Sequence, residues 1–173
     1  IKTKKKIREA LGGALFIDEA YTLFRGNNSD FGKEAVDTLV EEMTKHGENL
    51  VVILAGYPRE MEQLLESNPG LKSRFKKFFH FPDYSTDELI SIMNLYARKY
   101  SYTLEEKVIV YLEKELETNP PKGNGRFAEN LIHEAIQQQA LRLVKENQLN
   151  ESNLNIIALE DLKAAYQILK KGE

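Results

Sequence analysis

Hydrophobic residues in the first half of the chain form short runs, separated by segments with helical spacing. Residues 14–18 and 50–55 are such runs, and each is typical of a strand buried on both faces of a parallel sheet. Residues 78–81, closed by Pro82, predict a third strand. Helices are expected at about residues 4–11, 31–46, 58–66 and 71–75. The alternation of strand and helix predicts an α/β fold with a parallel sheet.

From Ser85 onward the pattern changes to helices, with no further long strand. Ser85-Thr-Asp-Glu88 and Thr103-Leu-Glu-Glu106 match the capping box and predict helices to about residues 100 and 117. A long amphipathic helix is expected over about 126–145. Its inner stripe consists of Leu131, Ile132, Ala135, Ile136, Gln139 and Leu143. After it come an extended pair, Ile156-Ile157, and a last helix over 159–170. We therefore expect two domains, a partial α/β core over 1–83 and a small all-helical domain over 84–173.

Composition narrows the class of protein. The 173 residues are 42% hydrophobic, enough to build a core. The net charge of -3 argues against general nucleic-acid binding, and the basic run Lys2–Lys6 is interpreted as a solvated helix face. Without cysteine, the chain has neither a thiolate zinc site nor a catalytic thiol. No run approaches the roughly 18 apolar residues of a membrane span, and no signal peptide is visible, so we expect a cytoplasmic protein without membrane contact.

The run Ala14-Leu-Phe-Ile-Asp-Glu19 ends in two adjacent carboxylates. Strands of a parallel sheet deliver ligand-binding groups at their carboxyl ends. Two acidic side chains there are costly to desolvate unless a cation or a reacting water partners them. The pair resembles the Walker B motif of nucleotide hydrolases. The alternative for so short a motif is that the two carboxylates merely begin a loop.

Two arginine segments extend the resemblance. Ser73-Arg74-Phe75 is similar to the arginine-finger segment of the AAA+ ATPases, and Gly125-Arg126-Phe127 is similar to their sensor 2 segment. An α/β core followed by a helical lid is the architecture of that superfamily. The alternatives are an ordinary surface arginine at position 74 and a helix-start surface charge at position 126.

Five further segments narrow the resemblance within the AAA+ ATPases. They are Leu15-Phe-Ile-Asp-Glu-Ala-Tyr21, Asp30-Phe-Gly-Lys-Glu-Ala35, Val52-Ile-Leu-Ala-Gly-Tyr57, Ser67-Asn-Pro-Gly-Leu71 and Phe81-Pro-Asp-Tyr84. Together they resemble the family that contains stage V sporulation protein K and the red-type rubisco activase. The segments at Arg74 and Asp30 are closer to the sporulation branch, and a rubisco-activase-like role is the alternative within the family.

The resemblance implies an ATPase that uses ATP and Mg²⁺, works as a ring of identical subunits with a hexamer expected, and remodels an unknown protein partner. Asp18 would hold Mg²⁺ through water, and Glu19 would orient and deprotonate the attacking water. Arg74 would act on the nucleotide of a neighbouring subunit, and Arg126 would reach the nucleotide from the lid. Tyr57, or Pro58 beside it, stands where the polar sensor 1 residue belongs; Tyr57 can supply a hydroxyl, and the alternative is that its ring only packs.

No G-x-x-x-x-G-K-[ST] phosphate loop occurs in the sequence. In the family that loop lies upstream of the helix with which this chain starts, and the strand leading into it lies between two of the strands predicted here. Because the chain begins at Ile1 within a helix, we expect a fragment that binds ATP weakly or not at all.

Two hypotheses from other classes remain. One is a non-catalytic scaffold or regulatory module; the other is a nucleic-acid-handling AAA+ protein such as a clamp loader, which the acidic balance disfavours. His46, His80 and His133 lie far apart in the sequence, without metal-ligand spacing.

Overall fold

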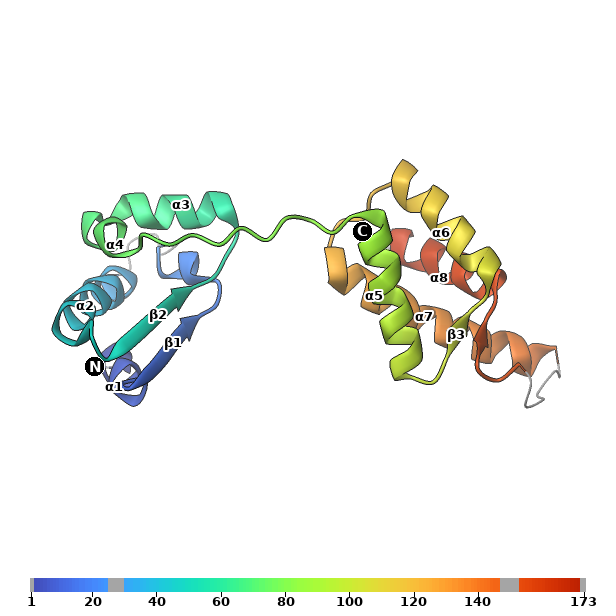
Figure 1. Ribbon diagram of the computed structural model, residues 1–173, viewed down its shortest axis with the longest axis horizontal. Coiled ribbons are helices and arrows are strands. Elements are labelled where there is room, and N and C mark those ends of the chain that lie inside the picture. Colours follow the sequence, from blue (N-terminus) through green and yellow to red (C-terminus); the bar gives the residue numbers. More distant parts are fainter. Residues whose placement is uncertain (1, 25–29, 147–152, 172–173) are drawn as a thin grey trace. The chain divides into compact units, whose positions relative to one another are not determined.

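The computed structural model describes residues 2–24, 30–146 and 153–171. The chain divides into two compact units, Ile1–His80 and Phe81–Glu173, which we call the first unit and the second unit and describe one at a time. The elements of the first unit are α1 (Lys2–Glu9), β1 (Gly13–Ile17), the 3₁₀ helix η1 (Ala20–Leu23), α2 (Asp30–His46), β2 (Leu50–Leu54), α3 (Pro58–Ser67) and α4 (Pro69–Arg74) (Figure 1).

β1 and β2 form a parallel pair in the first unit. The register runs from Gly13 opposite Leu50 to Ile17 opposite Leu54. Hydrogen bonds continue the pairing beyond both strands, because the Ala55 amide donates to the Ile17 carbonyl at 2.9 Å and the Ala20 amide donates to the Ala55 carbonyl at 3.0 Å. The carboxyl ends of the two strands are therefore tied to each other.

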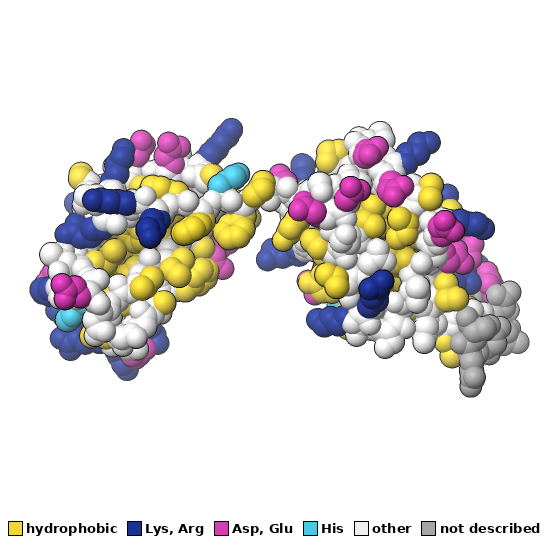
Figure 2. All heavy atoms as spheres, in the orientation of Figure 1, with side chains coloured by type: hydrophobic (Ala, Val, Ile, Leu, Met, Phe, Trp, Pro, Cys, Tyr) yellow, Lys and Arg dark blue, Asp and Glu magenta, His cyan; other side chains and the backbone are white. Residues whose placement is uncertain are grey.

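The core of the first unit lies on one face of this sheet. Alternate strand residues, Leu15, Ile17, Leu50, Val52 and Leu54, pack against the buried helical residues Ile7, Val36, Leu39, Leu64 and Leu71. The other face exposes Phe16, Val51 and Ile53, which are 59%, 58% and 46% accessible. Figure 2 shows hydrophobic side chains gathered over the sheet of this unit. The prediction of strands buried on both faces is wrong for the described residues, because only one face has a layer of helices against it.

The third strand predicted at 78–81 does not form. Residues 75–85 have no regular secondary structure, and Phe78, Phe79 and Phe81 are 70%, 83% and 88% exposed. A strand is stabilised by a neighbouring ladder and by cross-strand side-chain pairs. β1 and β2 pair only with each other, and among the described residues the aromatic run joins neither of their open edges, so it gains neither kind of stabilisation.

The second unit is a helical domain with one short strand pair. Its elements are α5 (Thr86–Lys99), β3 (Thr103–Leu104), α6 (Glu106–Thr118), α7 (Asn124–Lys145), β4 (Ile156–Ile157) and α8 (Leu159–Lys171) (Figure 1). The predicted inner stripe of the long helix is confirmed, because Leu131, Ile132, Ala135, Gln139 and Leu143 are buried and Ile136 packs against the core. The buried Gln139 amide donates to the carbonyls of Asn153 and Leu154 at 3.0 and 2.9 Å. None of the described helices has the length and apolarity required to cross a bilayer.

One of the two capping boxes is confirmed and the other is wrong. The Ser85 hydroxyl accepts from the Glu88 amide at 3.3 Å, and the Glu88 carboxylate accepts from the Ser85 amide at 2.8 Å. Thr103 instead belongs to β3, where its amide donates to the Asn155 carbonyl at 2.8 Å and Leu104 pairs with Ile157. α6 begins only at Glu106. Thr103 therefore takes part in a long-range strand pair and does not cap α6.

Candidate nucleotide site

Asp18 and Glu19 lie at the carboxyl end of β1, and both are exposed. The Asp18 carboxylate accepts a hydrogen bond from the Glu19 amide at 2.9 Å. The buried Ala20, which follows, is fixed by its bond to the Ala55 carbonyl. The turn after β1 is therefore anchored to the end of β2, while the two carboxylates remain open to solvent.

Glu19 has an unusual backbone conformation, with φ 47° and ψ 42° in the left-handed region. A residue with a Cβ pays for this conformation with steric strain, and such strain is concentrated at functional sites. The Glu19 carbonyl accepts a hydrogen bond from the Thr22 amide at 2.9 Å, and this bond forms the first turn of η1. Nothing in the sequence pattern indicated this conformation, and the next residue, Ala20, is held by a long-range hydrogen bond to Ala55.

Tyr57 lies at the end of the neighbouring strand. It precedes Pro58, the first residue of α3, and its ring centroid is 6.1 Å from that of Tyr21. Between strand and helix lies Gly56, where a Cβ would be only 2.7 Å from the Tyr21 ring and 2.8 Å from the Met61 sulfur. The parallel pairing thus brings Tyr57 to the same end of the sheet as Asp18 and Glu19.

Arg74 is the last residue of α4, a short helix held by Asn68. The Asn68 side-chain oxygen accepts from the amides of Gly70 and Leu71 at 2.8 and 3.2 Å. Its nitrogen donates to the Asp37 carboxylate on α2 at 3.0 Å. Asn68 therefore caps α4 and also attaches it to α2.

The Arg74 guanidinium is bound within the first unit. It donates to the Gly70 carbonyl at 2.9 Å and to the Thr44 hydroxyl at 2.5 Å. These partners belong to α4 and to the carboxyl-terminal part of α2, so they are not the acidic pair. A third, longer bond goes from the guanidinium to the Ser73 hydroxyl at 3.4 Å. A guanidinium has five N–H donors, so these three bonds leave others available.

Arg126 belongs to the second unit, where it is the third residue of α7 and is exposed. The helix begins after Gly123, whose φ of 102° lies in the left-handed region that suits glycine. The Arg126 amide donates to the Gly123 carbonyl at 3.1 Å. The residue predicted to reach a nucleotide thus projects from the first turn of the longest helix in the described part of the chain.

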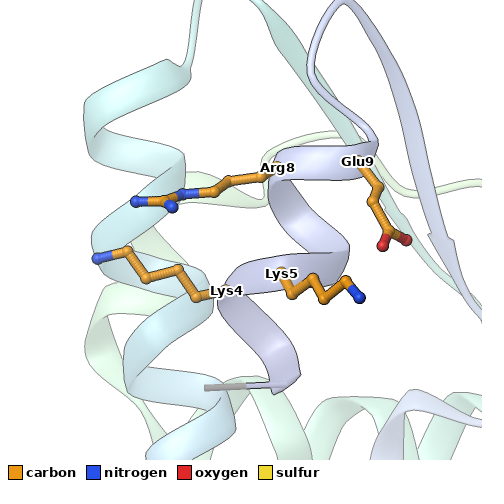
Figure 3. Close-up of a pocket in the computed structure, with 4 residues that line it drawn as sticks. All are labelled: Lys4, Lys5, Arg8 and Glu9. Atoms are coloured by element: carbon orange, nitrogen blue, oxygen red, sulfur yellow. The ribbon is translucent and has the colours of Figure 1, made fainter.

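A shallow pocket in the first unit is lined by Lys4, Lys5, Arg8 and Glu9 of α1, and it contains none of the predicted site residues. In Figure 3, Lys4 and Arg8 extend to one side of α1 and Lys5 to the other. Lys4 Nζ lies 3.2 Å from the buried Glu42 carboxylate on α2, and this close ion pair holds the pKa of Glu42 below its ordinary value. We infer that this side of α1 contributes to packing.

For two of the three histidines the described structure gives a polar side-chain partner. His46 lies 3.6 Å from Glu42, and His133 lies 3.0 Å from the Tyr100 hydroxyl. Within the described ranges no group of three or more His, Asp or Glu side chains is arranged to hold a metal ion.

Comparison with known proteins identifies the family of this chain. The profile of the ATPase family associated with various cellular activities (AAA) matches residues 2–83, and the profile of the AAA lid domain matches residues 85–172. The chain belongs to the AAA family of ATPases. The predicted fold class, an AAA core followed by a helical lid, is thereby confirmed.

The chain is 44% identical over 167 residues to stage V sporulation protein K of Bacillus subtilis (strain 168), covering 93% of this chain and 52% of that protein. It is 34% identical over 184 residues to the chloroplastic ribulose bisphosphate carboxylase/oxygenase activase of Cyanidioschyzon merolae (strain NIES-3377 / 10D), covering 99% of this chain and 60% of that protein. The chain thus spans little more than half the length of these relatives. The AAA domain of FIGL-1 in complex with ADP superposes with a TM-score of 0.67 at 15% identity, over 95% of this chain and 56% of that one, which supports the fold.

Proposed function

We propose that this chain is the carboxyl-terminal part of an ATP-hydrolysing AAA+ module that remodels a protein partner. The observation that carries the proposal is the geometry at the end of the sheet. Two exposed carboxylates, Asp18 and Glu19, follow the end of β1, and Tyr57 follows the end of the paired strand β2. This is the edge at which open α/β sheets bind ligands. A family of ATPases and a relative solved with ADP support a nucleotide as that ligand.

The acidic pair serves as a Walker B motif in this proposal. Glu19 orients the attacking water and accepts its proton, a role for which its exposed carboxylate is open to solvent. Asp18 holds Mg²⁺ through water. A single exposed carboxylate fits Mg²⁺, which keeps several waters and takes its other ligands from phosphate oxygens. When bound, the cation neutralises charge that develops on the phosphates.

The remaining contacts to the nucleotide come from three places. Tyr57 offers a hydroxyl in the position of sensor 1, and Arg126 acts as sensor 2 from the lid. Residues outside this sequence supply the phosphate loop, as the greater length of the relatives suggests. We therefore propose that this chain by itself turns over no ATP.

Arg74 is proposed as the arginine finger of a neighbouring subunit in a ring, for which a hexamer is our proposal. A permanently charged, planar guanidinium suits the charge on the transferring phosphoryl group. In the described structure its guanidinium is held by Gly70 of α4 and Thr44 of α2, and in the proposal these bonds are exchanged for contacts to the neighbour's nucleotide when the ring assembles.

The proposal is tested by mixing variants of the full-length protein that contains this chain. Asp18→Ala removes the cation ligand in one subunit, and Arg74→Ala removes the finger that the subunit offers its neighbour. Each variant alone is expected to lose Mg²⁺-dependent ATP turnover, and mixtures are expected to recover part of it. Absence of recovery at every ratio contradicts a finger that acts across subunits. Undiminished turnover in both variants indicates that these residues are not part of an ATPase site.

Within the family, we propose a role like that of stage V sporulation protein K, supported by its 44% identity against 34% for the algal activase. The test is to express the full-length protein in a Bacillus strain lacking stage V sporulation protein K. Restored sporulation that requires Glu19 supports this role. If the protein hydrolyses ATP but does not restore sporulation, the result argues for the rubisco-activase-like alternative. If it neither hydrolyses ATP nor restores sporulation, the result argues for a non-catalytic scaffold.

A further inference from the structure

The side chain of Asn124 binds the segment of chain that enters the second unit. Its oxygen accepts a hydrogen bond from the Tyr84 amide at 2.8 Å, and its nitrogen donates to the Asp83 carboxylate. The two bonds fix the orientation of the amide, because a backbone N–H only donates and a carboxylate only accepts. The half-buried side chain of Asn124 thus binds Tyr84 and Asp83, which precede it by 40 and 41 positions in the sequence.

The backbone at Asn124 is shaped for this contact. Its φ of 53° lies in the left-handed region, which asparagine adopts more readily than most residues with a Cβ. Gly125, which follows, has the Tyr84 ring against it, 3.5 Å from the place of a Cβ. The first turn of α7 and the segment before α5 are therefore packed as well as hydrogen-bonded.

The contact lies between a regular and an irregular part of the chain. Ser85, directly after Tyr84, is the N-cap of α5 and is closed by its capping box. Residues 75–82, directly before Asp83, have no regular secondary structure. Arg126 is two residues after Asn124 in the same helical turn. Anything that fixes Asp83 and Tyr84 to Asn124 therefore also fixes them to the backbone of Arg126.

We propose that Asn124 is a positioning residue that locks the incoming chain to the first turn of α7. Asp83, Tyr84 and Arg126 then move as one body, and any change in the direction of the chain takes place before Asp83. We call the two hydrogen bonds of Asn124 to Asp83 and Tyr84 the lock. The effect of the lock on ATP turnover rests on the function proposed above for Arg126, whereas the existence of the lock does not.

The lock is tested first in the 173-residue chain, by amide hydrogen exchange at Tyr84. Asn124→Gly removes both side-chain bonds and keeps the left-handed backbone free of strain. It is expected to speed exchange of the Tyr84 amide about fivefold or more, the scale of one net hydrogen bond. The control, Asn119→Ala, removes an exposed bond to Glu115 in the same unit and is expected to leave Tyr84 unchanged. Unchanged exchange in Asn124→Gly overturns the proposal.

Exchanging the partners separates positioning from simple loss of a side chain. Asn124→Asp keeps the acceptor for Tyr84 but places a second carboxylate against Asp83, so Tyr84 exchange is expected to quicken. The double variant Asn124→Asp/Asp83→Asn exchanges donor and acceptor, and it is expected to restore slow exchange. Failure of the double variant to differ from Asn124→Asp contradicts a bond between these two side chains.

Turnover by the full-length protein tests the positioning role. At a temperature where melting curves show every variant folded, Asn124→Gly is expected to lower kcat about three- to tenfold, a cost in the range of misplaced catalytic groups, and the double variant is expected to recover it. If Asn124→Gly speeds Tyr84 exchange but leaves kcat unchanged, and Arg126→Ala lowers turnover, the positioning role of Asn124 is overturned. If Arg126→Ala also leaves turnover intact, the function proposed for Arg126 is what fails.

Discussion

The ion pair between Arg142 and Asp161 holds α8 on α7, the helix that carries Arg126. Arg142 Nε and Nη2 donate to the two Asp161 carboxylate oxygens at 2.7 and 3.0 Å, and the Ala158 amide donates to the same carboxylate at 2.9 Å. The Asp161 side chain is 1% exposed and that of Arg142 is 18% exposed. The pair is therefore shielded from water, and the carboxylate has its bonds satisfied.

Arg142→Met tests the strength of this pair. The substitution keeps much of the aliphatic stem but leaves a buried carboxylate with one backbone donor, and removal of one partner from a buried pair costs about 3–5 kcal/mol. We expect the free energy of unfolding of the second unit to fall by about 3 kcal/mol, the lower end of that range, because the Ala158 amide still donates to the carboxylate. The double variant Arg142→Met/Asp161→Leu removes both charges and is expected to recover most of the loss.

Glu160→Gln is the matched control. Glu160 lies 3.3 Å from Arg142, but its side chain is 67% exposed, and exposed pairs contribute roughly 0–1 kcal/mol. Urea denaturation followed at amides of α7 and α8 measures each variant in the 173-residue chain. A loss below about 1 kcal/mol for Arg142→Met, or equal losses in Arg142→Met and Glu160→Gln, would refute the reasoning from burial.

Two further predictions concern the first unit. Asn68→Ala removes the cap of α4 and the bond to Asp37, so urea denaturation is expected to show that the free energy of unfolding falls by about 1–2 kcal/mol. Because α4 carries Arg74, Asn68→Ala in the full-length protein is also expected to lower ATP turnover, though less than Arg74→Ala does. Glu42 has a pKa lowered by its ion pair with Lys4. Its stabilising effect is therefore present above the pKa of the unfolded chain, about 4.3, and is lost as pH falls through the folded value. Melting temperatures between about pH 7 and pH 3 are expected to fall more steeply in the wild-type chain than in Glu42→Gln; parallel curves would contradict this assignment.

The fold was predictable where local patterns and burial agree. The stripe of α7 and the capping box at Ser85 needed only helical spacing and local side chains. The placing of Asp18, Glu19 and Tyr57 at one edge of the sheet was predictable, because parallel strands have their carboxyl ends at the same edge. The roles of these residues remain predictions, since geometry alone does not identify a catalytic group.

The errors arose where residues distant in sequence decide the structure. Residues 78–81 have the composition of a strand but no partner among the described residues, and Thr103 has a capping pattern but pairs with the segment at Ile156. The left-handed Glu19 precedes Ala20, whose amide is bound to the end of β2. The bond from Asn68 to Asp37 spans 31 residues. Periodicity and capping rules describe neighbours along the chain, and they do not contain such contacts.

The account depends most on Glu19 as the base of an ATPase, and Glu19→Gln in the full-length protein tests it most directly. Gln keeps the size of the side chain and removes its ability to accept a proton, so turnover is expected to fall by about 10²–10⁴ while ATP binding, measured by fluorescent-nucleotide titration, is retained. Glu62→Gln changes an exposed carboxylate on α3 and should leave both unchanged. Retained binding with turnover abolished only in Glu19→Gln is the predicted result, and undiminished turnover in Glu19→Gln would contradict the account.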